Sequence, residues 1–145
     1  MKVFLAGIIQ GSKVEAEIHD QTWRERIKAV LARHLPDAEL YCHYTRHPES
    51  ITYDLPGIRE TLQEGNRLAG ECDLLIAYLP GASMGTAIEM HEAVRSGAAV
   101  VTISTLAANW VIRAYSDRIF PDVAALEEFA ASGELQRLVA SKGKK

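Results

Sequence analysis

Short apolar runs alternate with longer segments of helical periodicity along the whole chain. Asp73–Leu79 is the clearest apolar run, and Val3–Ala6 and Ala99–Ile103 are two others. Strands that are apolar throughout are typical of a parallel sheet with helices on both faces, because neither face of such a sheet contacts water. This alternation of strand and helix predicts an α/β fold.

Five strands and the helices between them account for most of the sequence. Two further strands are expected at Leu40–Cys42 and Arg118–Phe120. Helices are expected from Asp20 or Thr22 to Leu35, around Ile58–Leu68, at Gly85–Arg95, at Asn109–Tyr115 and from Val123 to about Ala140. We predict one domain over residues 1–145, with a flavodoxin-like (Rossmann-like), doubly wound, five-stranded parallel sheet and a frayed tail at 141–145.

The composition argues against several classes of partner. The chain has 16 basic and 19 acidic residues and a formal net charge of −3, which does not favour binding to a nucleic-acid polymer or an anionic membrane. No stretch approaches the ~18 apolar residues of a membrane-spanning helix. The two cysteines, Cys42 and Cys72, are expected to be reduced and buried, so we expect a cytoplasmic protein.

Ligands of doubly wound sheets bind beyond the carboxyl ends of the strands. Three predicted loops lie there: Gly7–Ser12, His43–Pro56 and Leu79–Gly85. The third loop is rich in small residues, and the N–H groups that begin the following helix favour an anion. The sequence therefore predicts a phosphate or sugar site at this strand–loop–helix junction.

Glu89 has two interpretations. It lies at the flank of the apolar stripe of the predicted helix, from which its carboxylate could enter the crevice. However, Thr86-Ala87-Ile88-Glu89 also has the form of a capping box, in which the carboxylate accepts a backbone N–H at the helix start. Spacing alone leaves both roles open.

The segment Leu79–Ala93, with its Ser-Met-Gly-Thr-Ala-Ile-Glu-Met core, resembles the nucleoside 2-deoxyribosyltransferase-like family. That family includes the 2′-deoxynucleoside 5′-monophosphate N-glycosidases. The similarity extends to the first strand with its Gly7–Ser12 loop and to Gly97–Val111, about two thirds of the chain. The resemblance implies that Glu89 is a nucleophile, which forms a glycosyl ester as the base departs.

Three positions bear on the subfamily that the chain resembles. Ser83 stands six residues before Glu89, where the nucleotide hydrolases carry serine and the transferases carry aspartate. Gly65 stands where the family often has an aspartate that contacts the base or sugar, and Gln10 replaces a frequent arginine. These two departures put the general acid and the phosphate requirement in doubt.

The resemblance and the loops together give a set of site residues. Glu89 is the catalytic residue, and the substrate-binding residues are Gly7, Gln10, Gly11, Ser12, His43, Ser83, Met84, Gly85, Thr86 and, from a neighbouring subunit of a homodimer or larger assembly, Asn109. His43 and His47 have an H-x3-H spacing, but they lie in a predicted loop with no third ligand nearby. We therefore expect neither a metal nor a cofactor.

The sequence thus predicts cleavage of the N-glycosidic bond of a nucleoside or nucleoside 5′-monophosphate. Hydrolysis is favoured because serine at position 83 suits an anion, whereas aspartate would repel it. The alternatives are base exchange by a nucleoside 2-deoxyribosyltransferase and a catalytically idle nucleotide-binding module. A flavodoxin-type electron carrier is a weaker alternative, because the first loop lacks a hydroxyl-rich phosphate cradle.

Overall fold

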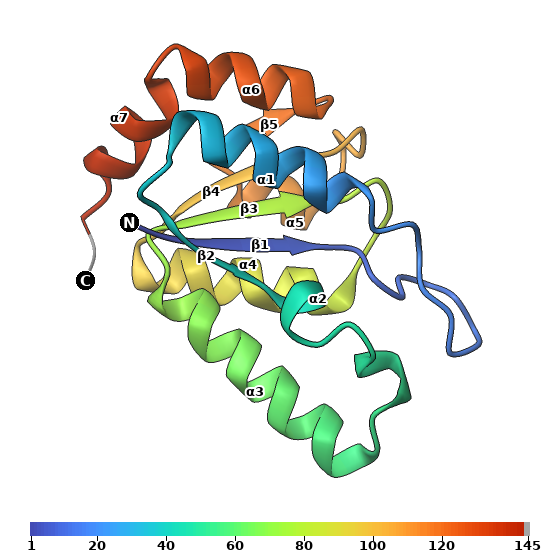
Figure 1. The fold of residues 1–145 in the computed structure, drawn as a ribbon. Helices are drawn as coiled ribbons and strands as arrows, with labels where there is room; N and C mark the ends of the chain where they lie inside the picture. Colours follow the sequence, from blue (N-terminus) through green and yellow to red (C-terminus); the bar gives the residue numbers. More distant parts are fainter. Residues whose placement is uncertain (144–145) are drawn as a thin grey trace.

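The computed structural model describes residues 1–143 of the chain. A five-stranded, all-parallel sheet forms its centre, in the order β2-β1-β3-β4-β5 (Figure 1). The strands are β1 (Lys2–Gly7), β2 (Glu39–Cys42), β3 (Leu74–Tyr78), β4 (Ala99–Ile103) and β5 (Arg118–Phe120). This strand order confirms the predicted flavodoxin-like sheet.

Helices cover both faces of the sheet. They are α1 (Trp23–His34), α2 (His43–Arg46), the 3₁₀ helix η1 (Ser50–Thr52), α3 (Leu55–Glu71), α4 (Met84–Ser96), α5 (Trp110–Tyr115), α6 (Val123–Ala131) and α7 (Glu134–Ser141). Side chains of α1, α6 and α7 share one apolar cluster with the sheet, and those of α3, α4 and α5 share the other. The central strands are therefore buried on both sides, which explains their continuous apolar runs.

Helix α3 packs on α4 through small residues rather than through its larger apolar ones. Thr61, Gly65 and Ala69 are buried at a spacing of four residues. In contrast, Ile58 and Leu62, whose periodicity predicted this helix, are 46% and 45% exposed. The small stripe brings the backbones of the two helices close together, and this close approach forms one wall of the site described below.

The predicted C-terminal helix is wrong in one respect, because it is two helices. Gly133 has a φ of 79°, in the left-handed region that glycine adopts readily, and it separates α6 from α7. The frayed tail does not begin at residue 141, since Ser141 belongs to α7 and Lys142 pairs with Asp117 at 2.5 Å. The remainder of that prediction, residues 144–145, lies outside the described residues.

Three smaller features belong to this fold: the state of the cysteines, the start of α1 and the character of the helices. Cys42 and Cys72 are free and buried, as expected. Helix α1 follows Thr22, whose hydroxyl donates to Asp20 and makes no cap hydrogen bond. No helix within the described part of the chain combines the length and the apolar character that a membrane crossing requires.

Candidate active site

A cavity of about 240 Å³ opens at the carboxyl end of β1, a little below the usual size range for small-molecule sites. It lies where the chain changes its winding direction, since β1 leads to α1 on one face and the neighbouring β3 leads to α4 on the other. Its lining residues come from β1, the first loop, α1, α2, α3 and α4: Leu5, Ala6, Gly7, Ile9, Gln10, Gly11, Arg24, His43, Thr61, Leu62, Gly65, Ser83, Met84, Gly85, Thr86 and Glu89.

The structure brings most of the predicted site residues together in this cavity. Nine of them line it: Gly7, Gln10, Gly11, His43, Ser83, Met84, Gly85, Thr86 and Glu89. Ser12 is exposed and lies outside it. Asn109 also lies outside the cavity of its own chain, where its side-chain oxygen caps α5 by accepting the N–H groups of Val111 and Ile112.

The start of α4 rules out the capping interpretation of Glu89. The N-cap is Ser83, whose hydroxyl oxygen accepts the N–H of Thr86 at 3.4 Å. Thr86 is therefore inside the helix, and Glu89 lies a full turn beyond the backbone N–H groups that a capping box would satisfy. The Ser83 hydroxyl keeps its own proton, so it can still donate to a ligand at the helix N-terminus.

Glu89 is half-buried and faces the backbone of α3. A Cβ atom placed at Gly65 would lie 3.7 Å from Oε1 of Glu89, so the missing side chain leaves room beside the carboxylate. Burial raises the pKa of Glu89 to about 8, and the positive charge of Arg24 opposes this rise. In the free protein at pH 7, Glu89 is therefore mostly protonated.

The first loop reaches the cavity because two of its glycines allow tight geometry. Gly11 has a φ of 59°, and a Cβ atom there would lie 2.7 Å from Cδ1 of Ile8. At Gly7 a Cβ atom would lie 2.4 Å from the ring of Trp23. That ring stacks on Tyr78, with ring centroids 4.5 Å apart, and closes the base of the loop.

His43 begins a short helix instead of a loop. It lines the cavity, and its Nε2 lies 3.2 Å from the hydroxyl of Ser50. Burial, aided by the nearby His47 and Arg24, lowers the pKa of His43 to about 4, so the ring is neutral at pH 7. Within residues 1–143 no group of three or more His, Cys, Asp or Glu side chains could hold a metal ion.

Arg24, Thr61 and Leu62 also line the cavity, and none of them is among the predicted site residues. The sequence pattern could have identified Arg24, because this residue precedes Ile27 and Leu31 at the spacing of the apolar stripe of its helix. A charged residue at a core position of a helix indicates a special role for its charge. No comparable pattern in the sequence identifies Thr61 or Leu62 as a site residue.

Comparisons with known proteins relate this chain to solved structures alone. No family model matches the sequence, and no curated protein matches it. The CMP N-glycosidase of Clostridium botulinum superposes with a TM-score of 0.55 at 19% identity, covering 91% of this chain and 98% of that one. The 2-deoxyribosyltransferase of Bacillus psychrosaccharolyticus gives a TM-score of 0.65 at 16% identity, covering 88% and 90%.

The chain shares their fold. The resemblance to the nucleoside 2-deoxyribosyltransferase-like family is thus supported at the level of architecture. An NADH:FMN oxidoreductase also superposes, with a TM-score of 0.51 at 12% identity, covering 99% of this chain and 91% of that one. Since enzymes of different chemistry share this architecture, function has to be argued from the cavity itself.

The raised pKa of Glu89 predicts a distinct dependence of stability on pH. Between about pH 4.5 and pH 8 the unfolded chain releases the proton of Glu89 while the folded protein retains it, so the free energy of unfolding falls as the pH rises. Glu89→Gln removes this effect. The free energy of unfolding of the variant should therefore rise relative to that of the wild type as the pH increases across that window, by at most about 1.4 kcal/mol per pH unit. The difference between the two proteins should level off above pH 8.

Urea unfolding at several pH values measures this difference. His43 acts in the opposite direction, because its lowered pKa removes stability as the pH falls from about 6.5 toward 4. That contribution is present in both proteins and cancels in the comparison. A stability difference that stays constant from pH 5 to pH 8 would contradict the buried, protonated state of Glu89.

Proposed function

We propose that this protein cleaves the N-glycosidic bond of a nucleoside or nucleoside 5′-monophosphate, with hydrolysis as the outcome. The observation that carries the proposal is the position of Glu89, whose carboxylate lies in a cavity together with the N-terminus of α4 and the first loop. The fold supports it, since the two superposed structures are named for N-glycosidase and deoxyribosyltransferase activities.

In the proposed mechanism the Glu89 carboxylate attacks the anomeric carbon of the sugar. The bond from that carbon to the base nitrogen breaks, its electron pair leaves with the base, and a glycosyl ester remains. Water then attacks the same carbon and breaks its bond to the Glu89 oxygen, which frees the sugar and restores the carboxylate. The proton that this water loses neutralises the departed base. Neutral His43, which lines the same cavity, is the side chain placed to hydrogen-bond to the departing base.

We place a 5′-phosphate at the N-terminus of α4. The helix begins there with unpaired N–H groups, and Ser83 and Thr86 add hydroxyl groups, while Gly11 allows close approach from the first loop. A phosphate in this position puts the sugar between the helix start and Glu89. The base then extends toward His43 and the small residues of α3.

The first experiment is a base-release assay over a panel of ribo- and deoxynucleosides and their 5′-monophosphates, with and without a free acceptor base. Glu89→Gln should lower the rate at least about 10³-fold, because no other carboxylate lines the described cavity. Glu92→Gln is the matched control, since Glu92 lies on the same helix but outside the cavity, and it should retain wild-type activity.

The outcomes separate the candidate functions. Free base and free sugar support hydrolysis, whereas incorporation of the acceptor base into a new nucleoside identifies a transferase. Tight binding of a nucleotide without cleavage identifies an idle binding module. Full activity of Glu89→Gln would show that Glu89 is not the nucleophile.

Ser83→Asp tests the phosphate site without removing the helix cap, because aspartate is as good an N-cap as serine. The added negative charge should repel a 5′-phosphate, so kcat/KM for a nucleoside 5′-monophosphate should fall at least about tenfold more than for the matching nucleoside. Ser83→Asn keeps the cap without the charge and should preserve the preference. An equal loss for both substrates in Ser83→Asp would place the phosphate elsewhere.

We also propose that the chain forms a homodimer in which Asn109 reaches the site of the partner subunit. Trp110, beside it, is 85% exposed, an unusual exposure for a tryptophan outside an interface. The Asn109 oxygen is occupied by the α5 cap, but its amide group remains free to donate across an interface. Trp110→Glu should convert a dimer into a monomer in light-scattering chromatography, and a monomeric wild type would refute this assembly.

A further inference from the structure

Arg24 and Glu89 are the two charged side chains among the described residues that line the cavity. They come from opposite faces of the sheet, since Arg24 belongs to α1 and Glu89 to α4. Both helices lie beside the carboxyl end of β1, where the cavity opens. Arg24 thus supplies a positive group in the wall of the cavity, and Glu89 supplies a negative one whenever its carboxyl group is ionised.

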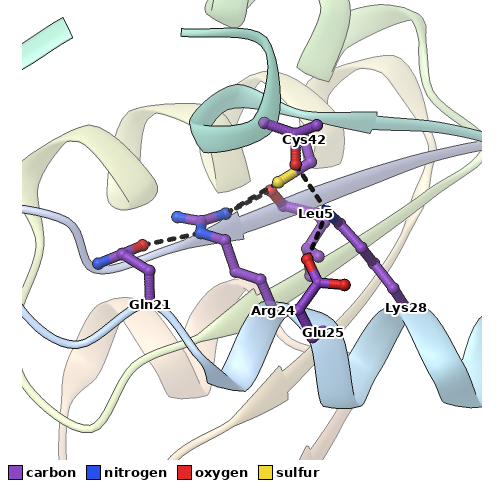
Figure 2. A network of polar contacts seen from close by, with 7 residues as sticks. Leu5, Gln21, Arg24, Glu25, Lys28 and Cys42 are labelled. Atoms are coloured by element: carbon purple, nitrogen blue, oxygen red, sulfur yellow. Dashed lines mark hydrogen bonds and ion pairs between the residues drawn. The ribbon is translucent and has the colours of Figure 1, made fainter. Parts of the chain in front are cut away.

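The Arg24 side chain is only 2% exposed, and several hydrogen bonds hold it in place. Its Nε donates to Oε1 of Gln21 at 2.8 Å, and its terminal nitrogens donate at 3.4 Å to the carbonyl oxygens of Leu5 and Gly7 and to Sγ of Cys42. Figure 2 shows the guanidinium between Gln21 on one side and Leu5 and Cys42 on the other. The Trp23 ring lies 4.2 Å from the guanidinium carbon.

None of these partners is a carboxylate. A buried cation without an ion pair is costly, and burial accordingly lowers the pKa of Arg24. The charge of Glu89 opposes that change, as the charge of Arg24 opposes the rise in the pKa of Glu89. Each group thus stabilises the charged form of the other across the cavity.

The other groups around Glu89 do not supply a counter-charge. Helix α3 presents Thr61, Leu62 and Gly65 to the cavity. His43 from α2 is neutral at pH 7, and burial raises the pKa of Tyr41 from β2 to about 12, so Tyr41 is neutral as well. Arg46 lies farther out and pairs with Glu64. Arg24 is therefore the one cation in the described wall of the cavity.

We propose that Arg24 is a positioning residue that favours the carboxylate form of Glu89, the form that attacks the sugar. This inference deepens the proposed function and rests on it. Entry of a substrate removes water from the cavity, which strengthens the attraction between the two charges because the local dielectric constant falls. The same removal of water would otherwise drive Glu89 toward its unreactive protonated form.

The experiment measures the ionisation of Glu89 directly, by ¹³C NMR of glutamate-labelled protein across the pH range. The Glu89 signal is identified by its absence in Glu89→Gln. Arg24→Met, which keeps an apolar stem in the space of the arginine, and Arg24→Gln, which keeps a donor for the Leu5 carbonyl, remove the charge. Arg24→Lys retains it, and Arg26→Met makes the same change of charge at an exposed position of α1.

We expect the neutral Arg24 variants to raise the pKa of Glu89 by about one unit or more. Arg24→Lys should keep it near the wild-type value, and Arg26→Met should leave it unchanged. The acid limb of the pH profile of kcat/KM should move with the NMR value. If Arg24→Met does not fold, Arg24→Gln provides the same comparison, and chromatography together with circular dichroism verifies the fold of each variant.

Two results would overturn the inference: a Glu89 pKa that changes by less than about 0.3 unit in the neutral variants, or an equal change in Arg26→Met. Failure of the proposed function looks different. In that case the wild type releases no base from any substrate, although the NMR titration still shows whether the two charges are coupled. A wild type that cleaves its substrate while Glu89 titrates independently of Arg24 would refute the positioning role alone.

Discussion

The change of winding direction at β1 is the constraint on which the rest of the site depends. The chain leaves β1 toward α1 on one face of the sheet and leaves the adjacent β3 toward α4 on the other. The two connections diverge, and side chains from both faces can enter the hollow between them. Arg24 and Glu89 meet around one cavity for this reason, although 65 positions of sequence numbering separate them.

The cavity brings two opposing electrostatic effects into balance. Burial favours the protonated form of Glu89, whereas the guanidinium of Arg24 favours its carboxylate. Close packing of α3 on α4, through the small residues Thr61 and Gly65, makes the burial possible, while the missing side chain at Gly65 leaves room beside the carboxylate. A carboxylate tuned in this way suits a nucleophile that has to ionise inside a dry site.

The predictions that were confirmed depend on patterns that act over a few residues. Ala99–Ile103 and Arg118–Phe120 form strands with the expected bounds, because apolar runs and turn residues act locally. The capping box at Thr86–Glu89 was wrong because Ser83 also fits an N-cap, and it begins the helix three residues earlier. The roles assigned to Glu89 and Ser83 stay proposals, although the cavity brings both together with seven other selected residues.

The sequence by itself determined the class of the fold, because burial on both faces leaves the central strands β1, β3 and β4 apolar along most of their length. It also supplied the candidate acid, through the resemblance of the segment around Glu89 to a known family. Tertiary structure alone decided which groups surround that acid. Arg24 reaches it from another helix, and Gly65 opens the space beside it, through packing between segments that share no local pattern. The electrostatic environment of a carboxylate depends on such distant neighbours, since charge and burial act through space and not along the chain.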